Sequence, residues 1–146
     1  MADKKKTKKD EGFSEETIKH LEFIQDVITR MNSNSFQMKG WMLAIVSALL
    51  GFYADSGNPR FAAVAILPIV TFWLLDTYYL WQERKFRGLY KDVAKITSNH
   101  EIKPFAMRPD LYKDGEYSFF DVLTSSTILP LYGLMVVLLG VISIFF

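Results

Sequence analysis

The chain has 146 residues, a length typical of one domain, and a formal net charge of only +1. It contains no cysteine, which excludes disulfides, thiolate metal sites and cysteine nucleophiles. Half of the residues are hydrophobic, and almost all long apolar runs fall in 41–54, 61–75 and 127–146. This distribution predicts an all-α integral membrane protein with three transmembrane helices.

Residues 1–12 form a tail rich in lysine and acidic residues, which cannot bury apolar surface and is expected to be disordered. Three interpretations of its lysines stay open. They can hold the chain against anionic lipid, capture a cytoplasmic nucleic acid or nucleotide, or simply confer solubility. The lysines concerned are Lys4, Lys5, Lys6, Lys8 and Lys9.

An amphipathic cytoplasmic helix is predicted over 13–35. Ser14 is a suitable N-cap, and apolar residues recur at helical spacing from Ile18 to Met31. The polar segment 32–35 either ends or bends this helix. His20 lies at the edge of the apolar face, where a satisfied protein contact is a better interpretation than a ligand. The acids expected at a cytoplasmic mouth are Glu15, Glu16, Glu22 and Asp26.

The first two membrane helices are predicted over 36–54 and 60–82, joined by a turn at 55–59 into a hairpin. Pro68 is expected to kink the second helix, and the helical pattern continues to residue 96. Irregular loop is expected over 98–117 and an interfacial stretch over 117–122. The third membrane helix is predicted over 124–146. The membrane domain is therefore 36–146, with a cytoplasmic segment at 83–123.

Lysine and arginine predict the orientation of the chain. Residues 1–40 hold eight, residues 55–60 hold one, residues 83–124 hold eight, and none follows. Cytoplasmic loops carry the excess of basic residues. The expected topology has the N-terminus in the cytoplasm and the C-terminus outside, in a bacterial inner membrane.

Small residues recur on one face of the first membrane helix, at a spacing that lets two helix backbones approach closely. They are Gly40, Ala44, Ser47, Ala48 and Gly51. Packing within one chain and packing between subunits are both consistent with this pattern. Gly133 and Gly140, seven residues apart, share one face of the third helix and are candidates for a gate.

Asp76 is the only acid within an otherwise apolar membrane helix, and Lys39 is its expected partner. The pair has two interpretations, a structural ion pair that fixes the register of the hairpin, or part of an acidic ring at the mouth of a cation pore. His100 lies in a loop, and no spacing suggests a metal site or a cofactor site. The sequence contains no P-loop, nucleophile elbow or zinc-protease motif, so an enzyme is not expected.

Four segments carry a family resemblance: "FIQDVITRMNSNSFQMKGWMLAIVSALL" at 23–50, "ILPIVTFWLLDTYYLWQERKFRGLYKDV" at 66–93, "PFAMRPDLY" at 104–112 and "TSSTILPLYG" at 124–133. They resemble a group of small bacterial inner-membrane proteins, and the chain is similar in build to the membrane effector of Hailong-type anti-phage systems. The resemblance implies an oligomeric channel that a nucleic acid or nucleotide signal, or a nucleotidyltransferase partner, keeps closed until infection.

Three helices cannot enclose a pore, so a channel requires a homo-oligomer, for which a tetramer is the first guess. The nearly uncharged third helix would then form a dry gate. Two alternatives remain open at this point. The chain can be a non-conducting membrane anchor that recruits a partner through its cytoplasmic part, or a holin-like lesion former.

Overall fold

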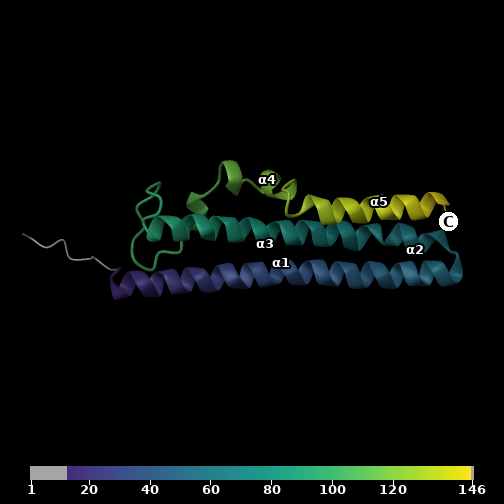
Figure 1. The fold of residues 1–146 in the computed structure, drawn as a ribbon, viewed down its shortest axis with the longest axis horizontal. Helices are drawn as coiled ribbons and strands as arrows, with labels where there is room; N and C mark the ends of the chain where they lie inside the picture. Colours follow the sequence, from purple (N-terminus) through teal and green to yellow (C-terminus); the bar gives the residue numbers. More distant parts are fainter. Residues whose placement is uncertain (1–12, 146) are drawn as a thin grey trace, which may run out of the picture.

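The computed structural model describes residues 13–145, and within them the ordered elements are helices, with no strand. Three long helices lie side by side, with α3 between α1 and α5 (Figure 1). The prediction of an all-α chain is confirmed for this range. The expected basic tail at residues 1–12 lies outside it.

The first helix, α1, runs without interruption from Glu15 to Ser56. Ser14 caps it as predicted, because its Oγ accepts a hydrogen bond from the Thr17 amide at 3.2 Å. At the other end Gly57 adopts φ 64° and donates its N–H to the carbonyl of Tyr53, which satisfies an otherwise free carbonyl.

The expected break at 32–35 does not occur. Serine and asparagine weaken helices because their side chains compete for backbone hydrogen bonds. Here Ser35 is buried and its hydroxyl bonds to Asp76 on α3, so a tertiary contact holds the segment helical. The predicted boundary between residues 35 and 36 is therefore not a helix end, and α1 includes both predicted helices.

The second predicted helix consists of two parts, α2 from Pro59 to Val64 and α3 from Ile66 to Val93. Pro68 offers no N–H to the carbonyl of Val64, and its ring crowds that carbonyl, so the helix is interrupted at Ala65. The predicted kink at Pro68 is thus confirmed as a break. Beyond residue 82 α3 continues helically, as expected, and ends three residues before the predicted position.

Residues 94–118 are mainly irregular, as expected, with two short 3₁₀ turns at Pro109–Leu111 and Gly115–Tyr117. A short helix, α4, covers Phe119–Leu123 in the stretch predicted as interfacial. The last helix, α5, spans Leu129–Phe145. It begins five residues later than predicted, with Pro130 in its first turn, where a missing N–H is tolerated.

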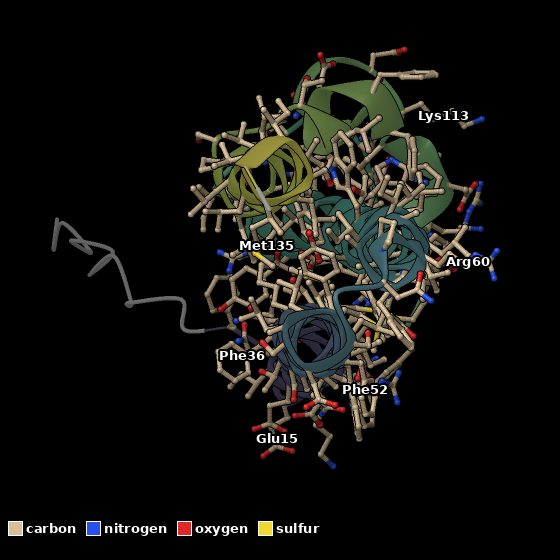
Figure 2. The ribbon with its side chains drawn as sticks, turned by 90° about the vertical axis from the view of Figure 1, so that its right-hand side faces the viewer. Glu15, Phe36, Phe52, Arg60, Lys113 and Met135 are labelled. Atoms are coloured by element: carbon tan, nitrogen blue, oxygen red, sulfur yellow. The ribbon has the colours of Figure 1, made fainter. Side chains whose placement is uncertain are left out.

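Two parts of the molecule differ in surface and core. The apolar half contains α1 from residue 36, α2, α3 up to residue 80, and α5. The loop half contains α1 up to residue 35, α3 from residue 81, and residues 94–123. One buried hydrophobic cluster occupies each half. In the apolar half, Figure 2 shows Met135 pointing between the helices, whereas Phe36 and Phe52 point outward.

Two helical segments are long and apolar enough to cross a membrane: α1, and α2 together with α3. With 17 residues, α5 lies at the lower limit of about 17–25 residues for a spanning helix. The structure thus contains two candidate spans plus one shorter apolar helix.

Candidate functional site

A buried polar cluster around Asp76, the Asp76 cluster, lies where the apolar half meets the loop half. Its members are Ser35, Lys39, Asp76 and Tyr132. The Asp76 carboxylate has no exposed surface, and the Lys39 Nζ lies 2.6 Å from its Oδ2. Ser35 donates its hydroxyl to Oδ1, and Tyr132 donates its hydroxyl to Oδ2 at 3.1 Å. The expected pairing of Asp76 with Lys39 is confirmed.

The surroundings of Asp76 favour the ion-pair interpretation over the acidic-ring interpretation. A buried carboxylate is tolerated when a cation and further hydrogen bonds compensate it. Lys39 supplies the cation and also donates to the Ser35 hydroxyl at 2.9 Å. The cluster joins α1, α3 and α5, so it fixes how these three helices sit along one another. The sequence analysis did not identify Ser35 or Tyr132 as members of this cluster. The only signals were their positions: Ser35 lies one helical turn before Lys39, and Tyr132 lies one turn after the buried Ile128.

The loop half contains a second buried carboxylate, Asp92, which the sequence analysis did not single out. Its side chain has no exposed surface. The Tyr112 hydroxyl donates to Oδ2 at 2.6 Å, and the Asn99 amide donates to Oδ1 at 3.2 Å. The Thr97 hydroxyl also bonds to Oδ1, and the His100 Nδ1 lies 3.2 Å from Oδ2. These five residues form the Asp92 cluster.

The Asp92 cluster fastens the irregular loop to the end of α3. The hydrogen bonds from Thr97, Tyr112, His100 and Asn99 together outweigh the effect of burial and lower the pKa of Asp92. Burial and the bond to Asp92 raise the pKa of Tyr112. Tyr112 packs so closely on Gly88 that a Cβ at that position would lie 2.6 Å from the ring. A side chain at residue 88 would therefore require the Tyr112 ring to shift.

His20 connects the loop to α1. The residue is 2% exposed, and its Nδ1 accepts a hydrogen bond from the Phe105 amide at 3.3 Å. Its Nε2 is buried and has no hydrogen-bond partner among the described residues. Burial lowers the pKa of His20, and the backbone of Ala106 partly opposes this shift. The prediction that His20 makes a satisfied protein contact therefore holds for Nδ1 but not for Nε2. A buried donor without a partner lowers the free energy of unfolding by about 1–3 kcal/mol.

A cavity of about 400 Å³ lies against His20 and the Asp92 cluster. It separates the first turns of α1 from the end of α3 and the loop that follows. Within the described residues, no group of three or more acidic or histidine side chains is arranged to hold a metal ion.

The predicted small-residue stripe faces away from the other helices. Gly40, Ala44, Ser47, Ala48 and Gly51 are all exposed. At about 100° per residue they lie opposite the packed face of α1, which contains Met42 and Val46. Figure 2 shows Glu15 on this outer side of α1, with Phe36 and Phe52 on its two flanks. The interpretation as packing within one chain is therefore wrong.

The remaining predicted residues are dispersed. Glu15, Glu16, Glu22 and Asp26 are exposed along the loop half of α1. Gly133 is half-buried and Gly140 is exposed, and a Cβ added at either would meet open space. Gly140 lines an apolar cavity of about 480 Å³ between α5 and the region of α2. The five lysines of the tail lie outside the described residues.

Comparison with known proteins found no match: no protein-family model, no curated protein and no solved structure matches the chain.

Proposed function

We propose that the chain spans a bacterial inner membrane and assembles through the back of α1 into an ion-conducting oligomer. The exposed surface of the apolar half supports the first part. In the most apolar stretch of α1 only 17% of the residues are buried, whereas the core helix of a soluble protein would be mostly buried. Large apolar side chains point outward from all three helices, among them Phe52, Leu67 and Val137.

The observation that carries the oligomer is the exposed small-residue stripe of α1. In lipid, interfaces between helices are enriched in small residues because these allow close backbone approach. The stripe is bounded by Phe36 on one flank and Phe52 on the other, so a neighbouring helix can seat between them. A ring of chains joined along α1 would contain a central path, with a tetramer as the first expectation.

The same side of α1 continues into the loop half as an exposed charged surface, where the acids Glu15, Glu22 and Asp26 outnumber the bases Lys19 and Arg30. Clefts lined by charge of one sign concentrate counter-ions. In the proposed oligomer these acids would gather at the cytoplasmic end and favour cations. In this proposal the acids of the pore mouth lie on α1. Asp76 has a structural role, because its contacts hold α1, α3 and α5 in register.

The proposed biological role is that of a depolarising effector in anti-phage defence, kept closed by a cytoplasmic nucleic acid, nucleotide or protein partner. This role rests on the similarity in general build between the chain and such effectors. With the orientation that the basic residues predict, the loop half and the N-terminus would face the cytoplasm and the C-terminus the periplasm.

The test uses the full chain purified in detergent and reconstituted in vesicles loaded with potassium chloride. We expect potassium efflux from the wild-type vesicles. Ala44→Leu, which fills the stripe, is expected to change efflux at least tenfold and to alter the oligomer size measured by cross-linking. Val137→Leu enlarges an exposed apolar side chain on α5 by one methylene and serves as the control outside the stripe.

Equal efflux from Ala44→Leu, Val137→Leu and wild-type vesicles would contradict assembly through α1. An absence of efflux from every sample would favour a second candidate, a non-conducting anchor. One observation supports that candidate: the buried Asp76 carboxylate is compensated within one chain by Lys39 and Tyr132, so it offers no free charge to an ion.

A further inference from the structure

The cavity beside the Asp92 cluster has no part in the proposed channel and lies at the far end of the loop half. Its volume is about 400 Å³, large enough for a small organic molecule. It is lined by α1, by α3 and by the loop after α3, so three segments distant in sequence converge on it. The polar or charged residues of its wall are Thr17, His20, Asp92, Lys95, Thr97, Ser98, His100 and Glu101.

The hydrogen bonds of His20 determine which of its nitrogens carries the proton. Nδ1 accepts from the Phe105 amide, so in the neutral ring the proton lies on Nε2. Nε2 is a buried donor with no partner among the described residues, and His20 is one of the residues of the cavity wall. One residue of the wall, His20, thus carries a buried N–H group that lacks an acceptor among the described residues.

The acidic residues of the wall do not supply that acceptor. Both oxygens of Asp92 are already engaged by hydroxyl, amide and imidazole groups. Glu101 is exposed and forms no ion pair with any described residue. Lys95 contributes an ammonium group, and it holds a left-handed backbone conformation with φ 55°, which non-glycine residues rarely adopt.

We propose that this cavity binds a small oxyanion, either a carboxylate or a phosphate ester. One oxygen would accept a hydrogen bond from His20 Nε2, the ammonium of Lys95 would attract the negative charge, and the hydroxyls of Thr17 and Ser98 would complete the site. The neutral histidine can serve this ligand because its Nε2–H is a hydrogen-bond donor while Nδ1 accepts from Phe105.

The position of the cavity selects a soluble ligand rather than a lipid headgroup. His20 precedes Lys39 by 19 positions on one continuous helix, about 28 Å along its axis. Lys39 itself lies at the boundary of the apolar half. A ligand at His20 is therefore well outside the layer that the apolar half would occupy. The proposal is independent of whether the oligomer conducts ions.

The test measures binding of inorganic phosphate and of acetate to the full chain in detergent, by isothermal titration calorimetry at constant ionic strength with chloride as the balancing ion. We expect saturable binding of at least one of the two probes. Lys95→Gly is expected to weaken it at least tenfold. That variant removes the ammonium while glycine accepts the same backbone conformation without strain. His20→Phe is expected to abolish binding, because it removes the N–H donor and keeps the ring.

Lys113→Ala, an exposed lysine outside the cavity, is the matched control and should bind like wild type. Heat signals that survive both Lys95→Gly and His20→Phe would show an adventitious ion only and would overturn the proposal. The proposal would also be overturned if neither probe binds. Binding of anionic phospholipid vesicles through Lys95, without binding of free phosphate or acetate, would overturn it as well. Potassium efflux does not enter any of these outcomes.

Discussion

Asp76 and Asp92 are both fully buried carboxylates on α3, but they are compensated in different ways. Asp76 has a cation, Lys39, together with two hydroxyl donors. Asp92 has four hydrogen bonds, and no described lysine or arginine forms an ion pair with it. The first arrangement joins three helices, and the second fastens an irregular loop to one helix. We therefore expect that both members of the charge pair can be replaced together at little cost, whereas removing Asp92 leaves several separate donors without an acceptor.

The largest effect is expected for Asp92→Ala. It leaves several buried donors without an acceptor, and we expect the free energy of unfolding to fall by about 4 kcal/mol. Hydrogen exchange of the Asn99 and Phe105 amides should accelerate together, because the loop loses its attachment to α3. Unchanged exchange at both amides would show that Asp92 does not hold the loop.

Asp76→Asn is expected to cost less, about 2 kcal/mol, because Lys39 is 22% exposed and its ammonium can turn toward solvent. Adding Lys39→Gln to Asp76→Asn should restore at least half of the loss, since both charges are then gone. The measurement is chemical unfolding in micelles. A double variant no more stable than Asp76→Asn would mean that Asp76, like Asp92, depends on its hydroxyl donors.

Gly88→Ala should destabilise the loop half by about 1 kcal/mol. The new Cβ would overlap the ring of Tyr112, which costs more than the helix gains from replacing glycine. Because Tyr112 donates to Asp92, exchange at the Asn99 amide should rise as well. Gly133→Ala meets open space and is the matched control. Equal stability of both variants would mean that the ring shifts without cost.

The smallest effect concerns pH. Burial lowers the pKa of His20, so below pH 6.5 the unfolded chain binds more protons than the folded chain, and stability falls as the solution is acidified. Asp92 adds a similar loss only below its ordinary value of 3.8, because its pKa is lowered too. His20→Gln should flatten the stability profile between pH 7 and 5 and leave the profile near pH 3 unchanged. An identical slope in both chains would exclude His20 as its source.

The sequence predicted the helices well where apolar residues recur at helical spacing over many turns. Pro68 and the turn at 55–59 were interpreted correctly, because proline and glycine act through the local backbone. The break at 32–35 was predicted wrongly, since the partner that holds Ser35 helical lies 41 residues further along the chain.

The same distinction separates the two aspartates. Asp76 could be paired with Lys39 because a lone acid and a lone base stood at matching depths of two antiparallel helices. Asp92 could not be recognised, because its partners are spread over an irregular loop whose path has no periodicity. The one signal was its position three residues after the buried Leu89, on the packed face of α3.

The uninterrupted course of α1 from Glu15 to Ser56 has a consequence for dissecting the chain. The loop half and the apolar half share two helices, so neither is a module that can be cut away. Deleting residues 1–35 would remove Ser35 from Asp76, and it would also uncover Leu89 and Tyr112 by removing Ile24 and Ile28. A truncated chain of this kind would report the loss of half of a core rather than the loss of a binding segment, and point substitutions are the sound way to separate the two halves.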